Sequence, residues 1–362
     1  MKLGIIFRLH SLFDIGKDTP MTPVGGRDMT KNHEVGLTSA EITGLWSTYI
    51  GESMSICMTK HMLKYLEDAD IKPLLEESLA VSQKQVSEIQ TIFMKEKFPI
   101  PKGFTDDDYN SDAPALFFNL LPLSYVYGMS RLSIVNYGMM VTAMAREDVR
   151  LFISTCLNSS QDLFNKAITI MLKKGIYDRP AMIPYPEGIE FAKNRETFLS
   201  KWFEPQRPLN VQELTAIFFN SERNYFGLVF LTGFIQVVKD ERIKKYLIKG
   251  KKLAEKQIKF LNDTLRKDDL PVASMINTEI SMSTISPFSE KLILNLITML
   301  NSTALTFLGH SLSTSSRADL SVEYSKLMVE IMQYGKEGMD LLIERQWFEE
   351  PPHAPNRKEL AK

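Results

Sequence analysis

The sequence predicts an all-α protein made of two tandem four-helix bundles related by an internal duplication. Three observations carry this prediction. Segments of the first half return in the second half at a nearly constant offset, apolar residues recur at helical spacing, and strand-like alternation bounded by turns is absent. A chain of 362 residues is also longer than one typical core, which favours two domains.

The duplication is visible in matched segments. LTSAEITGLW from Leu37 returns as LNVQELTAIF from Leu209, and the segment that begins at Ile71 returns from Ile243, both at an offset of 172 residues. Farther along, KKGIYDRPAMIP and ERQWFEEPPHAP match at an offset of 171 residues. The change in offset indicates one insertion or deletion between about residues 101 and 117.

Four helices are expected in the first repeat, over residues 38–67, 70–97, 115–145 and 148–175. Thr38 followed by Glu41 is a capping-box pattern, which marks the start of the first helix. Asp148 can accept hydrogen bonds from the free N–H groups at the start of the fourth helix. Gly175 suits the position just after its end.

The second repeat is expected to form helices over residues 210–239, 241–267, 287–315 and 318–346. In both repeats an aromatic residue and then prolines follow the fourth helix. Because proline cannot continue a helix, we expect the fourth helices to stop near Gly175 and Gln346. Tyr177 and Trp347 should then fold back onto their own bundles.

The predicted organisation has five parts: a leader at 1–28, bundles at 29–176 and 209–348, a strap at 177–208 and a polar tail at 349–362. The leader has no clear period and is interpreted as a disordered arm or as sequence upstream of a start at Met29. The strap is expected to be ordered through its aromatic residues Tyr185, Phe191, Phe198, Trp202 and Phe203. The tail is expected to fray.

The composition is that of a soluble globular protein, with 44% hydrophobic and 24% charged residues. A net charge of −1 gives no overall attraction to nucleic acid or to an anionic membrane. The two cysteines, Cys57 and Cys156, are too few for a disulfide framework, and the apolar stretch after Met1 is too short for a signal peptide. These features favour the cytoplasm.

Both third helices are unusually apolar. Arg131 is the only charged residue from Ala113 to Ala145, and none occurs from Leu292 to Leu312. Such lengths could span a bilayer, but polar residues interrupt them and the neighbouring helices are amphipathic. We therefore expect buried helices that pack the two bundles together or form an oligomer interface.

The sequence offers one candidate for a metal site. The stretch MSICMTKHM contains a possible soft-metal cluster, formed by Met54, Cys57, Met58 and His61. The repeat partners of these residues are Phe226, Val229, Phe230 and Gly233. Positions that accept Met or Phe are typical of a core, and a helical Glu-x-x-His motif for two metal ions is missing. We expect no metal, no other cofactor and no catalytic residue.

A basic face on the helix over 241–267 is the most distinctive surface pattern. Its members recur every three or four residues, as Arg242, Lys245, Lys249, Lys252, Lys256 and Lys259. The face is either simply solvated or suited to an anionic partner, such as an acidic patch on another copy. Aromatic interleaving and nucleic-acid motifs are absent, so nucleic acid is not the expected partner.

The segments LTSAEITGLW, RPLNVQELT and RADLSVEYSKLMVEIMQYGKEGMDLLIERQWFEEPP resemble a tandem-repeat family of unknown function from spore-forming bacteria. The units of that family are similar to the ferritin-like bundle of the spore coat protein F group. The resemblance covers about residues 29–362. It implies a ferritin-like fold and a role in sporulation, and it carries over no catalytic residue.

Three functional hypotheses follow. The preferred one is a non-enzymatic structural or interaction protein, cytoplasmic or associated with the spore, whose partners are other proteins or further copies of itself. The second is a degenerate ferritin-like protein that keeps a metal or redox role. The third is a carrier of a hydrophobic ligand between the bundles, which an unfilled apolar cavity near the third helices would support.

Overall fold

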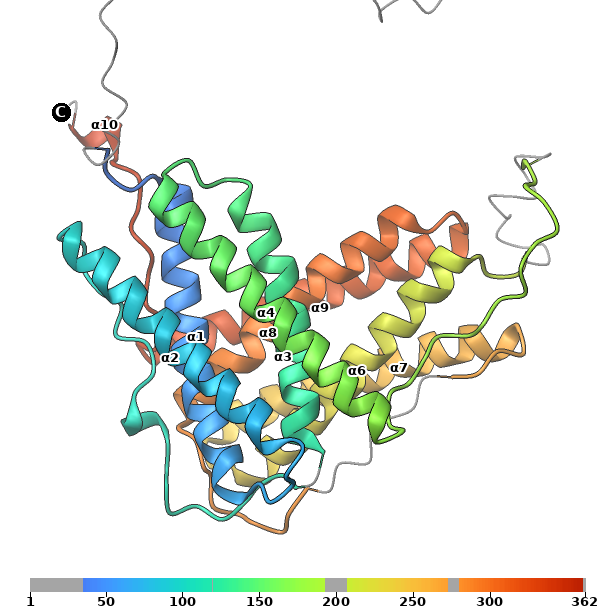
Figure 1. Cartoon of the computed structure of the whole chain (residues 1–362), viewed down its shortest axis with the longest axis horizontal. Coiled ribbons are helices and arrows are strands. Elements are labelled where there is room, and N and C mark those ends of the chain that lie inside the picture. The colour runs from blue at the N-terminus through green and yellow to red at the C-terminus, as the bar shows by residue number, and fades with distance from the viewer. Residues whose placement is uncertain (1–34, 119, 193–206, 273–279, 361–362) are drawn as a thin grey trace, which may run out of the picture. The chain divides into compact units, whose positions relative to one another are not determined.

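The computed structural model describes residues 35–118, 120–192, 207–272 and 280–360. From Leu37 onward the chain forms one compact unit (Figure 1). The first repeat contributes α1 (Ser39–Tyr65), α2 (Lys72–Lys95), α3 (Leu121–Val141) and α4 (Glu147–Lys173). The second contributes α6 (Val211–Val237), α7 (Glu241–Lys267), α8 (Glu290–Thr314) and α9 (Ala318–Glu344). The short helices η2 (Asp106–Asp108) and α10 (Arg357–Leu360) lie outside the bundles.

The helix bounds follow the duplication. Helix α6 begins and ends 172 residues after α1, and α9 begins and ends 171 residues after α4. In each repeat the first helix packs along the second and the third along the fourth, and the two hairpins contact each other. Within the described ranges no strand occurs, only two isolated β-bridges. The predicted all-α fold of two repeated four-helix units is confirmed.

A buried glutamate closes each bundle at the same place. Glu41 accepts the N–H of Thr38 at 2.7 Å, which confirms the predicted capping box, and also the N–H of Arg146 at 2.7 Å. Glu213 accepts the N–H of Arg317 at 3.0 Å in the second repeat. Each glutamate therefore ties the start of the first helix to the turn before the fourth. These bonds satisfy N–H groups that the helices leave open.

The fourth helices end as predicted. Gly175 and Gln346, the second residues after α4 and α9, have positive φ angles of 67° and 57°. The N–H of Trp347 donates to a carbonyl of the last turn, that of Leu342, at 2.9 Å. The Tyr177 ring lies edge-on to Tyr127 of its own bundle at 6.1 Å, and Trp347 is partly buried against the core.

The two repeats share a central apolar core. Phe117 of the first repeat lies 5.5 Å from Phe230 and 6.0 Å from Phe234 of the second, measured between ring centres. Tyr125 of the first repeat also contacts Phe230, at 6.3 Å. Each repeat has a further apolar cluster of its own. The core is therefore continuous between the bundles, whereas the domain boundaries at 29–176 and 209–348 stay a prediction.

The loops that join the second and third helices pair across the repeats. Isolated antiparallel bridges join Tyr109 to Phe288 and Phe117 to Ile280. The N–H of Asn110 donates to the carbonyl of Pro287 at 2.9 Å. These bonds satisfy loop backbone that would otherwise be buried without partners, because the loops cover the shared core.

Both third helices contact the opposite repeat, as one of the sequence alternatives expects. A Cβ added to Gly128 of α3 would lie 3.3 Å from the ring of Phe226 on α6. Lys291 at the start of α8 donates to the carbonyl of Gly103 at 2.9 Å. Among the described helices, α8 is long and apolar enough to cross a membrane, and 61% of its apolar stretch is buried in the protein. The shared core accounts for the apolar character of both helices.

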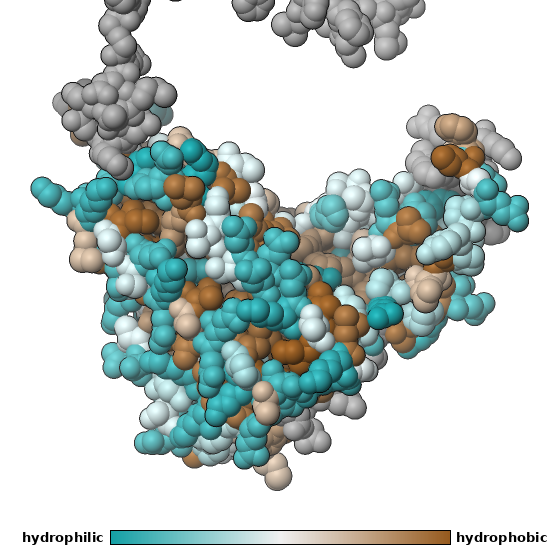
Figure 2. Space-filling view, viewed as in Figure 1, coloured by the Kyte–Doolittle hydropathy of each residue, from teal (hydrophilic) through white to brown (hydrophobic). Residues whose placement is uncertain are grey.

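The segments outside the bundles expose two of the strap aromatics. Tyr185 and Phe191 are 98% and 85% exposed, so neither ring is buried against the bundles, and the order of the strap stays a prediction. Figure 2 shows hydrophobic surface at the outer end of this segment. The other strap aromatics, Phe198, Trp202 and Phe203, and the leader 1–28 lie outside the described residues. The tail is held at its start, where the Glu349 carboxylate accepts the N–H groups of 102 and 103, both at 2.7 Å.

Candidate functional site

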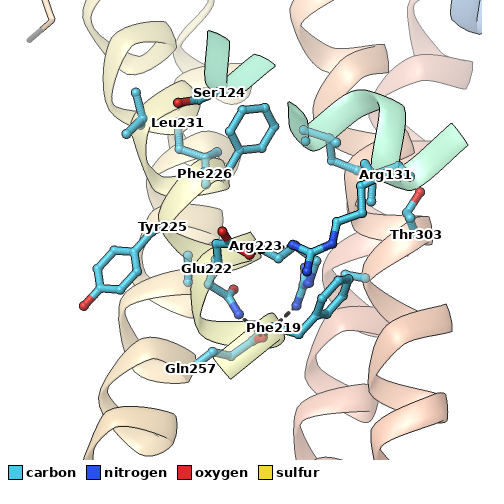
Figure 3. Close-up of a pocket in the computed structure, with 18 of the residues that line it drawn as sticks. Ser124, Arg131, Phe219, Glu222, Arg223, Tyr225, Phe226, Leu231, Gln257 and Thr303 are labelled. Atoms are coloured by element: carbon cyan, nitrogen blue, oxygen red, sulfur yellow. Dashed lines mark hydrogen bonds and ion pairs between the residues drawn. The ribbon is translucent and has the colours of Figure 1, made fainter. Parts of the chain in front are cut away.

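An apolar cavity of about 140 Å³ lies between α3 of the first repeat and α6, α7 and α8 of the second (Figure 3). Its apolar wall includes Leu121, Leu132, Phe226, Leu253, Ile297 and Leu300. Gly227 on α6 faces open space in the cavity, since a Cβ there would meet no atom within 4 Å, whereas Tyr334 fills the space over Gly250. The cavity lies beside both third helices, which is where the carrier hypothesis expects one.

Charged side chains from α3 and α6 stand in this wall (Figure 3). Arg131 donates to Glu222 at 2.5 Å, and its guanidinium lies 3.8 Å from the ring centre of Phe219. The Tyr127 hydroxyl donates to the same carboxylate at 3.1 Å. Burial raises the pKa of Tyr127 above its usual value, so this hydroxyl keeps its proton. The charge of Glu222 is therefore balanced by Arg131.

Arg223 has no such partner. Its guanidinium donates to the side-chain carbonyl of Gln257 at 3.5 Å, and its Nε–H is buried without an acceptor. None of the carboxylates in the described part of the chain forms an ion pair with it. Burial lowers the pKa of Arg223 to about 10, so the group stays charged at neutral pH. The cavity wall therefore carries one uncompensated positive charge.

The sequence analysis did not single out Arg223. Its repeat partner is Gly51, so the duplication gives no hint of a charge at this position. A usable signal was present nevertheless, because Glu222 and Arg223 are the only charged residues between Glu213 and Lys239. Charges in an otherwise apolar helix often mark a functional position.

A second cavity, of about 380 Å³, lies between the first bundle, α8 and the tail. Glu52 on α1 lines it and accepts hydrogen bonds from Ser82 at 2.6 Å and Tyr137 at 2.9 Å. Burial raises the pKa of Glu52, and the two hydrogen bonds oppose this only in part. Its repeat partner Asn224 instead binds Gln257, at 3.1 Å. The two bundles therefore carry different polar groups at matching depths.

We expect Glu52→Gln to stabilise the protein more at neutral than at acidic pH. The folded-state pKa of Glu52 lies above its unfolded value, so its favourable contribution is present in acid and is lost as the pH rises through the folded pKa. Glutamine removes that loss because it does not titrate. Thermal unfolding of both proteins at about pH 4 and about pH 8 measures the effect. A difference in melting temperature that is the same at both values contradicts a buried, titrating Glu52.

The candidate soft-metal residues lie together in the core, as Met54, Cys57, Met58 and His61 on the buried face of α1. The Cys57 thiol donates to the carbonyl of Thr105 at 3.4 Å, and His61 Nε2 accepts the N–H of 116 at 3.4 Å. Burial raises the pKa of Cys57 to about 12 and lowers that of His61 to about 4. Backbone groups thus engage the Cys57 thiol and Nε2 of His61, whereas Nδ1 of His61 is buried without a hydrogen-bond partner. Among the residues described, no three His, Cys, Asp or Glu side chains could share a metal ion.

The basic face of α7 is largely paired within the chain. Three members reach acidic residues of α9, in the pairs Arg242–Glu344, Lys249–Glu337 and Lys256–Glu330. Lys259 pairs with Asp263 on α7 itself at 2.6 Å. Lys245 and Lys252 are exposed, and no ion pair of theirs occurs in the described ranges. Most of the face is thus a solvated ion-pair ladder, and an anionic partner for it stays a prediction.

The fold and the cavity define a class of protein: a duplicated all-α bundle with a partly open, mainly apolar cavity whose wall holds a half-buried arginine. The chain belongs to the family DUF3231, described as a protein of unknown function, which matches residues 27–189 and again residues 197–360. The two consecutive matches confirm the tandem repeat and the expected family of unknown function.

One solved structure is similar over part of the chain. It is a crystal structure from Bacillus halodurans C-125 described as a putative spore coat protein, with 19% sequence identity and a TM-score of 0.39. The similarity covers 42% of this chain and 99% of that chain. A search of curated proteins finds no significant match.

Proposed function

We propose that this protein is a non-enzymatic binding protein that carries a small hydrophobic ligand in the cavity between α3 and α6–α8. The observation that carries the proposal is the wall of this cavity, whose exposed surface is mainly apolar although charged and polar side chains stand in it. Pockets for small molecules are typically apolar with a small number of placed polar groups. The sequence analysis already raised a carrier of a hydrophobic ligand between the bundles, with an apolar cavity near the third helices as its support.

The potential nucleophiles favour binding over catalysis. Both thiols are buried, and burial raises the pKa of Cys57 to about 12 and the pKa of Cys156 well above its usual value. A thiol acts as a nucleophile in its ionised form, so neither cysteine is suited to covalent catalysis. His61 lies among the rings of Tyr65, Tyr109 and Phe288, and its helical neighbour Cys57 keeps its proton because burial raises the pKa of that thiol.

Filling the cavity is expected to weaken ligand binding while it stabilises the fold. A Cβ added to Gly227 meets no atom within 4 Å, and Gly227 lines the cavity. Gly227→Leu should raise the free energy of unfolding by about 1 kcal/mol, because leucine is the better helix former. It should also lower the affinity for octanol at least about tenfold by occupying the apolar space. Calorimetric titration with octanol and thermal unfolding measure the two effects.

Gly138→Leu is the matched control. Gly138 lies on α3, away from the cavity lining, and a Cβ there also meets nothing within 4 Å. The control should gain similar stability and keep the affinity for octanol. If both variants bind octanol as tightly as the unaltered protein does, the ligand does not occupy this cavity and the carrier function is wrong.

A second candidate function is a structural or interaction protein associated with the spore. The strap favours it, because large apolar side chains at Met182, Tyr185, Ile189 and Phe191 are at least 85% exposed. Exposed apolar clusters commonly mark contact sites. Following a tagged chain through sporulation tests this candidate, and absence from the spore removes it. Elemental analysis after chelator-free purification tests the remaining alternative, a ferritin-like unit with a residual metal role.

A further inference from the structure

The positive charge in the cavity wall identifies the chemical class of the ligand. Glu222 is already engaged by Arg131 and Tyr127. Asp178, the other acidic residue of the lining, forms no ion pair with Arg223. The guanidinium of Arg223 thus faces the cavity with Gln257 as its hydrogen-bond partner.

Arg223 is half-buried and its Nε–H is buried without an acceptor, which is costly because this group loses water without gaining a counter-charge. A bound carboxylate would compensate this charge, because the planar guanidinium of arginine can donate two parallel hydrogen bonds to it. In Figure 3 Arg223 lies near Glu222, Gln257 and Arg131, and Phe219 and Phe226 on the same helix place aromatic rings on either side of it along the chain. An anion bound there would therefore have an apolar body beside its charge.

The size of the cavity limits that apolar body. Its volume of about 140 Å³ is close to that of an engineered apolar cavity of about 150 Å³ that admits benzene. One aromatic ring or the first carbons of an alkyl chain would fill the same space, and the open side of the cavity leaves room for the rest of a longer single chain. A large lipid with two long chains would not fit.

We propose that the ligand of this cavity is a small amphipathic carboxylate, whose carboxylate binds the Arg223 guanidinium and whose apolar body lies between α3, α6 and α8. This inference rests on the proposed carrier function and names its ligand class. The Nε–H of Arg223, which is buried without an acceptor, is one of the donors available to the carboxylate. Phe226, Leu300 and Ile297 offer apolar contacts to the body.

The test compares three probes with the same chain length: octanoate, octanol and octylamine. Calorimetric titration of the full-length protein at neutral pH should show octanoate binding at least about tenfold more tightly than octanol, and octylamine weakest. Arg223→Met keeps much of the side-chain volume and removes the charge. It should abolish the preference for octanoate while octanol still binds. It should also raise the melting temperature of the ligand-free protein, because a buried unpaired charge is gone.

Lys252→Met is the matched control, because it removes one exposed positive charge from α7 and should change neither the preference nor the melting temperature. Equal binding of octanoate and octanol to the unaltered protein overturns the carboxylate assignment and leaves the carrier function intact. Binding of none of the probes overturns both. The comparison of probes on the unaltered protein needs no variant, so it decides the question even if Arg223→Met does not fold.

Discussion

Replacing Glu213 by alanine is expected to lower the free energy of unfolding by about 3–5 kcal/mol, as when one partner of a buried charge pair is removed. Glu213 is fully buried, and Arg207 donates to both of its oxygens at 2.9 Å. The backbone N–H groups of Asn210 and Arg317 donate to it at 3.0 Å each. Without the carboxylate these buried donors lose their acceptor, and the start of α6 separates from the turn before α9.

Urea unfolding followed by circular dichroism measures this loss, with Glu255→Ala on the exposed face of α7 as the control. Burial raises the pKa of Glu213, but its hydrogen bonds to Arg207 and the backbone outweigh burial and hold that pKa below its usual value. The contribution should therefore be present at neutral pH and disappear as the pH falls through the folded-state pKa. A loss below about 1 kcal/mol at neutral pH, typical of an exposed pair, contradicts the buried clamp.

Trp347→Ala is expected to lower the free energy of unfolding by about 3 kcal/mol, as for a large aromatic side chain removed from a core. Trp347 is partly buried against the central apolar core, and its N–H closes the end of α9 on Leu342. The following prolines forbid further helix, so the chain turns and brings the ring onto the protein. Loss of the ring would leave a void between α9 and the first repeat.

Phe348→Ala is the control for Trp347→Ala. Because Phe348 is 37% exposed, its removal should lower the free energy of unfolding by less. The difference in fluorescence between the unaltered protein and Trp347→Ala isolates the emission of this one tryptophan. Its maximum should lie at the short wavelengths of an apolar surrounding. A cost near zero together with the emission of a water-exposed ring would show that the segment is a solvated tail.

Much of the fold could be predicted from the sequence because it depends on local chemistry. Thr38 with Glu41 marks the start of a helix, and Gly175 suits the positive φ angle after one. The offset between repeats then carries each local feature to the second bundle. The exposure of Tyr185 was not predictable in this way, because aromatic residues are buried on average and the sequence does not show whether a surface is present to bury this ring.

The candidate site was predictable only in part. The carrier hypothesis placed a hydrophobic ligand between the bundles and named an apolar cavity near the third helices as its support. The sequence analysis missed Arg223 because the residues near it along the chain do not show that it forms no ion pair in the fold. That absence depends on α3, where Arg131 engages Glu222 from the opposite repeat. Whether a charge is compensated is a property of packing.

The sequence by itself determined the helices, their ends, the duplication and the all-α class, because these depend on residue spacing, capping and backbone geometry within a few turns of helix. The tertiary structure alone decided that the bundles share one core, that the basic face of α7 pairs with α9, and that Arg223 faces a cavity. These features arise from contacts between residues on separate helices and, for the core and the cavity, on separate repeats. Burial and Coulomb energies depend on distance in space, and the order of residues along the chain does not specify that distance.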